Sequence, residues 1–308
     1  MSQPPGPKGG VELGGGQEPA GLVGQWAEFE AMGTVVRLRA DGIDPAQAAR
    51  LARQAERLTA ELEALLSRFN PGSDVSRLQD AGGQFIRVDS RTAEVLEASV
   101  RWREVTGKAF DVCLGSGELS SDASGRWRLT QGAKLDLGGI AKGYVADLLR
   151  DLYTCAAGAL VVMGGSSISA AGRPSDGTVW RIGLRAPGHG PDQTFGTVEL
   201  ASGALSTSGD YVRQAEEGRG MRHRRAMILD PRTRGAPATE VLSATVLADQ
   251  GMAAEALSTA AIVLGWSGLA RIHAAHPEFE AVLVTETAVL ATPQLAGVFQ
   301  PRTKQFAS

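Results

Sequence analysis

Cysteine, aromatic residues, net charge and long apolar runs are all scarce in this sequence of 308 residues. Only two cysteines occur, Cys113 and Cys155, and neither belongs to a CxxC motif, so the sequence predicts neither a disulfide framework nor a cysteine zinc site. A net charge of −3 indicates no general affinity for nucleic acid or anionic membranes. The longest apolar stretch, residues 256–266, is too short to span a bilayer. These absences favour a soluble globular protein without a nucleic-acid partner or a transmembrane segment.

Both ends of the chain are expected to lie outside the folded domain. Residues 1–24 are rich in glycine and proline and lack an apolar run, so we expect a disordered tail rather than a secretory signal. Residues 25–300 contain no internal repeat and no linker, which predicts one domain, followed by a short tail at residues 301–308. With no signal peptide and no lipobox cysteine, the expected location is the cytoplasm.

Segments with strand periodicity and segments with helix periodicity follow each other irregularly. Helices are predicted at residues 45–67, 91–106, 141–153, 251–264 and 267–275, with Asp44 and Ser90 as the first two N-caps. Strands are predicted at residues 26–40, 85–88, 127–137, 159–163, 180–184, 197–200, 226–229, 242–247 and 281–284, and an exposed loop at residues 111–125. Because no steady βαβ alternation is present, the predicted class is α+β, a single domain of mixed or antiparallel sheets with packed helices.

The most informative stretch is KLDLGGIAKGYVAD at residues 134–147. It predicts a strand that ends in a tight glycine turn and opens a helix, so that free backbone N–H groups and the positive end of the helix dipole point at one spot. Such a spot suits an anionic group; Lys142 adds a positive charge, and Asp136 can accept hydrogen bonds from a ligand. The same pattern also fits an ordinary strand-to-helix turn, and it is neither a GxGxxG fingerprint nor a P-loop.

DLGGIAKGYVAD resembles the signature of the FAD:protein FMN transferase (ApbE) family. Six further segments resemble motifs of that family and follow in its order: AMGT at 31–34, SRFN with SDVSRL at 67–78, AFD at 109–111, GG at 164–165, ILDPRT at 228–233 and ALST at 256–259. The similarity covers nearly all of residues 26–300. It implies a single ApbE-like domain related to the T-fold.

The resemblance also implies an activity and a set of site residues. Family members bind FAD and Mg²⁺, move FMN onto a threonine or serine hydroxyl of an acceptor protein, and release AMP. Carried over by motif, the FAD pocket would be lined by Met32, Phe69, Ala109, Phe110, Asp111, Asp136, Lys142 and Ile228. The metal would be held by the Gly139 carbonyl, Glu255 and Thr259.

Magnesium prefers hard oxygen ligands, and a bridging metal neutralises the pyrophosphate during attack, so this ligand set agrees with the chemistry. Glu255 and Thr259 stand at i and i+4, which places them on one face of a helix. Without the family resemblance, the same pair also fits a polar stripe on a helix surface. Many relatives are exported lipoproteins, in contrast to the location expected here.

Two positions depart from the family pattern. Glu255 stands where members usually carry Asp, and the added methylene moves the carboxylate outward by about one bond length, on the order of 1.3 Å, which Mg²⁺ tolerates poorly. Met227 stands where members carry a histidine thought to accept the proton of the incoming hydroxyl. His223 is the nearest alternative, but in an extended segment it lies about 13 Å away along the chain. The turn after Pro231 is also altered, because Arg234 precedes Gly235.

These departures leave two functions open. Loss of a general base typically lowers a rate by about 10²–10⁴-fold, so the chain is either a flavin transferase that is impaired or an FAD-binding protein that stores or carries the flavin with little catalysis. No catalytic residue is assigned, and His223 is the one alternative to the missing histidine.

Three other features of the sequence give less information about function. Ser206 and Ser208 lie in no G-x-S-x-G elbow and are expected to be structural or to contact a ligand phosphate. His273 and His276 lack a third metal ligand and are expected at the surface. The basic run at residues 219–225 fits either a solvated loop or attraction of a phosphate-bearing ligand.

Overall fold

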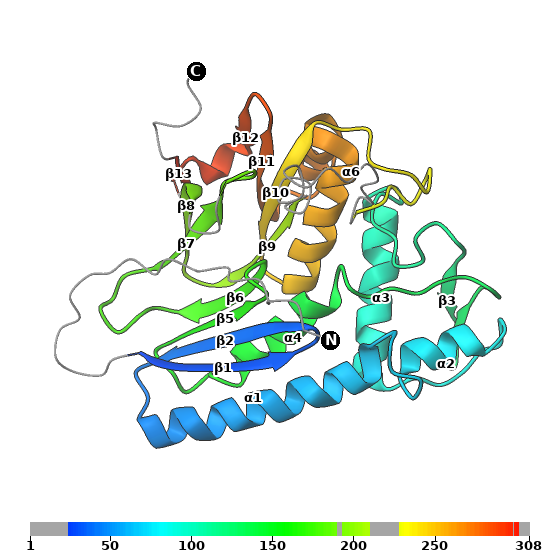
Figure 1. Cartoon of the computed structure of the whole chain (residues 1–308), viewed down its shortest axis with the longest axis horizontal. Coiled ribbons are helices and arrows are strands. Elements are labelled where there is room, and N and C mark those ends of the chain that lie inside the picture. The colour runs from blue at the N-terminus through cyan, green and yellow to red at the C-terminus, as the bar shows by residue number, and fades with distance from the viewer. Residues whose placement is uncertain (1–23, 190–192, 210–227, 298, 302–308) are drawn as a thin grey trace, which may run out of the picture.

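A curved antiparallel sheet forms the centre of the molecule (Figure 1). The structure is a computed structural model that describes residues 24–189, 193–209, 228–297 and 299–301. The sheet has eight strands in the order β1-β2-β5-β6-β9-β10-β11-β12, and each neighbouring pair is antiparallel. Their bounds are Gln25–Ala31, Thr34–Asp41, Gly158–Met163, Ser167–Gly172, Gly203–Gly209, Val241–Ala248, Phe279–Thr285 and Val289–Ala291.

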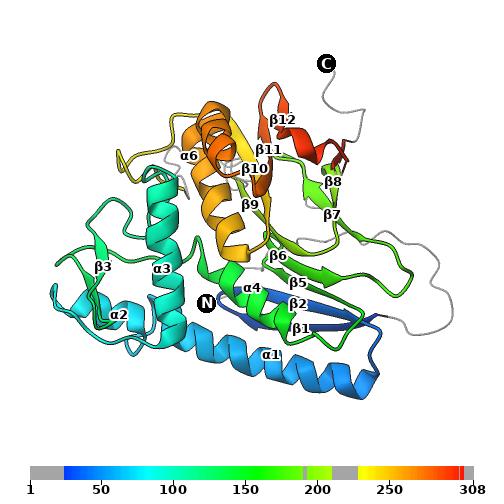
Figure 2. The same ribbon diagram turned by 180° about the vertical axis from the view of Figure 1, so that it is seen from behind.

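Helices cover one face of this sheet (Figures 1 and 2). Helix α1 (Pro45–Leu66) packs against β1, α4 (Ala141–Asp151) against β5 and β6, and α6 (Gly251–Ala275) against β9 and β10. Helix α3 (Ser90–Val105) packs beside α6, and the short helix α2 (Asp74–Asp80) contacts the hairpin of β3 (Leu119–Ser121) and β4 (Trp127–Leu129). The α+β prediction is therefore confirmed.

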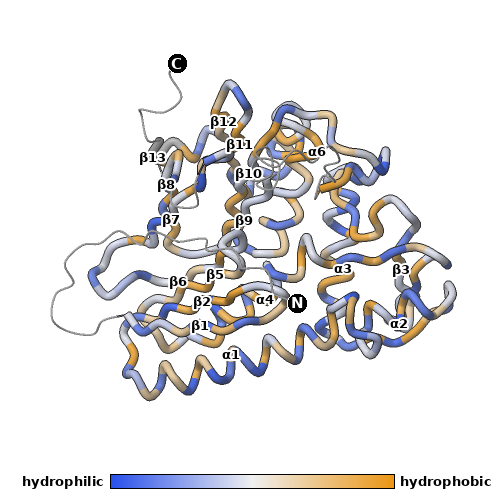
Figure 3. Tube along the Cα trace, viewed as in Figure 1, coloured by the Kyte–Doolittle hydropathy of each residue, from blue (hydrophilic) through white to orange (hydrophobic). Residues whose placement is uncertain are grey.

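A second, three-stranded sheet packs on the other face. It has the order β13-β8-β7, with bounds Phe299–Pro301, Thr194–Leu200 and Trp180–Arg185, and a 3-10 helix, η2 (Pro293–Gly297), precedes β13. Side chains alternate across β5: Val161 and Met163 join the principal core, and Leu160 and Val162 join a second core with Trp180. This two-sided burial explains the continuous apolar run of β5, which lies in the part of the sheet where Figure 3 shows many hydrophobic segments.

Local sequence signals set the ends of α1 and the break in α6. The Asp44 side chain accepts a hydrogen bond from the Gln47 N–H, Pro45 begins α1, and Ser67 ends it, as predicted. In α6, Gly265 adopts φ +67, at the boundary predicted between two helices. By length and composition α6 could cross a bilayer, which the prediction from residues 256–266 missed. However, 67% of its most apolar window is buried inside the fold, as in the core helix of a globular protein.

Several predicted elements differ from the structure. The predicted strand at 127–137 is limited to β4, and the one at 85–88 is reduced to a single bridge between Ile86 and Trp127. Asp89, not Ser90, caps α3. The predicted exposed loop after Phe110 begins with buried residues and includes β3. Of the predicted strand at 226–229, the described residues Ile228 and Leu229 are not in a strand.

Strands β6 and β9 and helix α2 were not predicted. The two strands read SISAAG and GALSTSG, and these small residues have weak strand propensity. They become strands because each is paired on both sides within the sheet.

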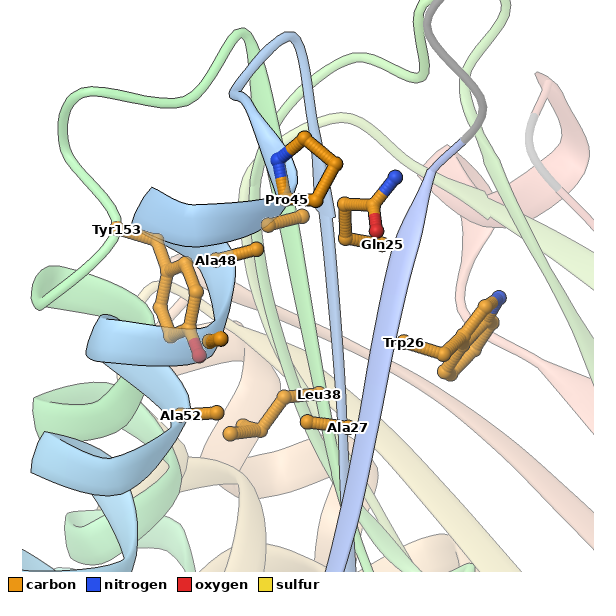
Figure 4. A pocket seen from close by; sticks show the side chains of 10 residues that line it. Gln25, Trp26, Ala27, Leu38, Pro45, Ala48, Ala52 and Tyr153 are labelled. Atoms are coloured by element: carbon orange, nitrogen blue, oxygen red, sulfur yellow. The ribbon is translucent and has the colours of Figure 1, made fainter.

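A cavity of about 110 Å³ lies between the β1–β2 hairpin and the alanine-rich start of α1, and Trp26 and Tyr153 are among the residues that line it (Figure 4). None of the predicted site residues lines it.

Helices α4 and α6 touch backbone to backbone at Gly143 and Gly251. A Cβ added to Gly143 would lie 2.2 Å from the Gly251 carbonyl oxygen, and one added to Gly251 would lie 2.4 Å from the Gly143 carbonyl oxygen. Neither glycine has a positive φ, so close approach, not backbone conformation, requires glycine at both positions.

We expect Gly143→Ala to destabilise the protein by about 3 kcal/mol, because the added methyl group meets an immobile backbone carbonyl. Urea unfolding followed by circular dichroism measures the change. Gly72→Ala is the matched control, since its nearest neighbour would lie at an ordinary 3.5 Å. Equal stabilities of the two variants would show that the helices separate at little cost.

Candidate functional site

The glycine corner, defined here as Asp136 to Gly139, joins the chain after β4 to the start of α4. The Asp136 N–H donates to the Val112 carbonyl at 2.8 Å, and the Asp136 carboxylate accepts from the Gly138 N–H at 2.9 Å. Helix α4 has no side-chain N-cap, because Ile140 occupies that position. A helix start without a side-chain cap retains backbone N–H groups that an anionic ligand can satisfy.

The corner faces α6, as the family resemblance implied. A Cβ added to Gly139 would lie 3.6 Å from the Thr259 hydroxyl oxygen, so this hydroxyl stands directly beside the corner. The Lys142 ammonium lies 3.1 Å from a carboxylate oxygen of Glu255 and donates to the Gly138 carbonyl at 3.0 Å. Gly138 and Glu255, which are more than a hundred positions apart, thus each contribute an oxygen atom to one ammonium.

Glu255 is buried, with 3% of its surface exposed, and among the described residues only one of its two carboxylate oxygens has a partner. The Ser167 hydroxyl donates to Oε1, which also pairs with Lys142, whereas Oε2 is buried and has no hydrogen-bond partner among the described residues. A buried carboxylate oxygen without a partner is energetically costly. A cation placed beside Oε2 would remove that cost.

Hydroxyl groups of β9 lie against the hydroxyl groups of Ser258 and Thr259 on α6. Ser208 of β9 lies 2.8 Å from the Ser258 hydroxyl and 3.4 Å from the Thr259 hydroxyl, and Ser258 donates to Ser206 at 3.3 Å. No group of three or more His, Cys, Asp and Glu side chains gathers anywhere in the described residues. A metal at the corner would therefore be held by one carboxylate with hydroxyl and carbonyl oxygens, which are hard donors suited to Mg²⁺.

The AFD segment lies against the corner, but the carboxylate of its aspartate, Asp111, binds backbone N–H groups of its own loop. A Cβ on Gly139 would lie 3.4 Å from the Phe110 ring. The Asp111 carboxylate accepts the N–H groups of Cys113 at 2.9 Å and Gly115 at 3.1 Å, and it lies 3.5 Å from the Arg103 guanidinium. Burial, with the neighbouring Asp111 charge, raises the pKa of the Cys113 thiol to about 12, so this cysteine is no nucleophile at neutral pH. Asp111 holds the loop in place.

The SRF segment also reaches the corner. The Arg68 guanidinium lies 3.5 Å from the Asp136 carboxylate and 4.5 Å from the centre of the Phe69 ring, and that ring is 81% exposed. A phenylalanine ring is usually buried, and an exposed ring beside a charged group is suited to stacking against a planar ligand. Phe69 and Asp136, predicted from separate motifs, are therefore linked through Arg68.

Met32 and Ile228 are placed less directly. Met32 has φ +53 in the turn between β1 and β2, where its N–H donates to Glu63 at 2.9 Å. Ile228 is half-buried against the principal core. Within the part of the chain that the structure describes, neither shares a hydrogen bond with the corner or with α6. Met227 and His223 lie outside the described residues.

Asp147 fixes α6 against α4. Its carboxylate accepts the Gly251 N–H at 2.7 Å and the Ser169 hydroxyl at 2.6 Å, and it pairs with Arg150 at 3.2 Å. Burial raises the pKa of Asp147, and these three contacts oppose the rise. Sequence reasoning missed this residue and Ser167, because both act on partners that are distant in the chain.

The raised pKa of Asp147 predicts a pH-dependent effect of Asp147→Asn. In the folded state the carboxyl keeps its proton to a higher pH than in the unfolded chain, so its contribution to stability falls as pH rises from about 3.8 through the folded pKa. The unfolding free energy of wild type minus that of Asp147→Asn should therefore decrease between pH 4 and pH 7. Parallel urea titrations measure this difference. Asp151→Asn is the control, since Asp151 pairs with the same Arg150 but is 59% exposed. A difference that grows with pH would contradict dominance by burial.

Comparison with known proteins places this geometry in context. The model of the ApbE family matches residues 32–121 and 116–283. An FAD:protein FMN transferase of Treponema pallidum (strain Nichols) is 28% identical over 302 residues, covering 82% of each chain. A flavin transferase ApbE from Vibrio cholerae superposes with a TM-score of 0.79 at 22% identity, over 90% of this chain and all of that one. An ApbE protein from Thermotoga maritima gives a TM-score of 0.75 at 25% identity, over 88% and 98%.

Proposed function

The chain belongs to the ApbE family, and we propose that it is a Mg²⁺-dependent flavin transferase that moves FMN from FAD to a threonine or serine hydroxyl of an acceptor protein. Curated relatives are FAD:protein FMN transferases at 25–32% identity. The observation that carries the proposal is the juxtaposition of the glycine corner with Glu255 and Thr259 of α6. One carbonyl, one carboxylate and one hydroxyl there form a ligand set for a hard divalent cation.

The proposed reaction is a phosphoryl transfer. The acceptor hydroxyl oxygen bonds to the phosphorus of the FMN half, the bond from that phosphorus to the bridging oxygen breaks, and AMP leaves with the bridging oxygen. When bound, Mg²⁺ would neutralise charge on the pyrophosphate. The Gly139 carbonyl, Glu255 and Thr259 would hold the ion, and this assignment is supported by Oε2 of Glu255, which has no partner among the residues the structure describes. The proton of the attacking hydroxyl requires an acceptor, and Met227 cannot be one.

The proposed FAD pocket follows the predicted residues with one refinement. Asp136 and Lys142 at the corner would contact polar parts of the nucleotide, and the exposed Phe69 ring would stack against a planar part. Met32 and Ile228 complete the proposed lining. The AFD segment would act through its backbone and the Phe110 ring, because Ala109 is buried and the Asp111 carboxylate is used inside its own loop.

A second candidate function is retention of FAD without efficient transfer. Two observations favour it: Met227 replaces the expected proton acceptor, and Glu255 is already paired with Lys142. Such a protein would be purified with tightly bound, uncleaved FAD. The two functions differ in AMP release and not in flavin binding.

We expect Met227→His to raise the rate of Mg²⁺-dependent AMP release from FAD, with a panel of candidate acceptor proteins, by about 10²-fold, because it restores a general base. Chromatography of AMP and intact-mass analysis of the acceptor measure release and covalent FMN. Met227→Leu is the matched control, since leucine fills a similar volume and accepts no proton; it should leave the rate unchanged.

The outcomes separate the two functions. Covalent FMN on an acceptor with the wild-type chain supports the transferase. Intact bound FAD, with neither AMP nor covalent FMN in wild type or in Met227→His combined with Glu255→Asp, would refute it and leave the binding protein. A rate that is the same in Met227→His and Met227→Leu would show that position 227 does not handle the proton.

A further inference from the structure

One ammonium group lies between the two elements that form the proposed metal site. Lys142 Nζ is 3.0 Å from the Gly138 carbonyl oxygen and 3.1 Å from Glu255 Oε1. Gly138 and Lys142 are four residues apart, so the side chain folds back over the first turn of α4 towards the corner. The ammonium thus contacts a backbone carbonyl oxygen and a carboxylate oxygen. The proposed metal site would use the same two kinds of oxygen, with the carbonyl of Gly139 in place of that of Gly138.

The electrostatic requirement of Glu255 explains this arrangement. Its carboxylate is buried, and a buried carboxylate is stable only when a positive partner compensates for its lost hydration. Lys142 is the cation that forms an ion pair with it in the described chain, and Ser167 supports the same oxygen. The Lys142 side chain is itself 25% exposed, so it lies at the edge of the site, next to solvent into which it could turn once its two contacts break.

A divalent ion and the ammonium cannot share this carboxylate cheaply. A cation held by Glu255, Thr259 and the Gly139 carbonyl would lie within a few ångströms of Lys142 Nζ, and two like charges at that distance in a poorly solvated site repel strongly. Within the described ranges Oε2 has no partner, whereas Oε1 has two, so an incoming ion finds one oxygen without a described partner and one occupied by the ammonium.

We propose that Lys142 is an exchangeable counter-ion of Glu255. In the metal-free protein its ammonium neutralises the carboxylate; a divalent cation takes its place, and the released ammonium turns to the phosphate groups of the nucleotide. The last step rests on the proposed function, whereas the exchange itself involves only the protein and the metal. Because the metal frees a phosphate-binding group, metal and nucleotide binding favour each other, and by reciprocity each strengthens the other by the same factor.

The first test measures Mn²⁺ binding to the full chain without flavin, by the electron paramagnetic resonance signal of free Mn²⁺. Lys142→Met removes the competing ammonium and should tighten Mn²⁺ binding at least tenfold. Lys134→Met, which removes one exposed positive charge near the same corner, should change it less than twofold. Equal or weaker Mn²⁺ binding by Lys142→Met than by wild type would overturn the exchange.

A second measurement uses the wild-type chain and does not depend on the folding of a variant. Acetylation by acetic anhydride, followed by mass spectrometry of peptides, reports how free each lysine amine is. Saturating Mg²⁺ should raise the acetylation rate of Lys142 severalfold relative to Lys134. A Lys142 rate that Mg²⁺ leaves unchanged or lowers would overturn the proposal. Because both tests omit FAD and acceptor, a positive result together with absent FMN transfer would refute the proposed function alone.

Discussion

The site depends on the close contact between α4 and α6. Gly143 and Gly251 allow the two helix backbones to meet, and Asp147 binds the first N–H of α6 from the side of α4. With the two helices fixed there, the residue one turn further along α6 from Gly251 is Glu255, and the next turn brings Thr259 to Gly139. The corner and the acidic side chain are positioned by backbone contact, so a side chain in the interface would displace the proposed metal ligands relative to one another.

Local signals predicted the parts of the fold that are local in origin. The cap at Asp44, Pro45 and the strong breaker after Ser67 sufficed for α1, and Gly265 marked the break in α6. Strands β6 and β9 could not be found in this way, because their small residues become strands through pairing with neighbours that are distant in sequence. The buried start of the loop after Phe110 was missed for a similar reason: Asp111 organises it through its own backbone contacts, which a polar, glycine-rich composition conceals.

The site shows the same division. Helical spacing placed Glu255 and Thr259 on one face, and the glycine pattern placed an anion-binding turn at residues 138–139; the structure brings the two together. Pairing of Lys142 with Glu255 was not predicted, since the resemblance assigned this lysine to the flavin pocket. Ser167 gave no signal at all, because it is separated from Glu255 by 88 positions and its segment looks like a weak strand.

The effect of Glu255 on the proposed metal site therefore cannot be judged from the length of its side chain alone. In the proposed metal site, a glutamate in place of the aspartate that the resemblance implies would be a misplaced ligand only if its surroundings were also those of the family pattern. In this chain the longer side chain is held by a hydroxyl from β6 and an ammonium from α4, both on the same oxygen, and its second oxygen has no partner in the part of the chain that the structure describes. A shorter side chain on the same backbone would withdraw the carboxylate from α4 by about one bond length, on the order of 1.3 Å, which would break a 3.1 Å ion pair. Glu255 and Lys142 thus act as a pair: the length of the acidic side chain decides whether the Lys142 ammonium can reach its carboxylate.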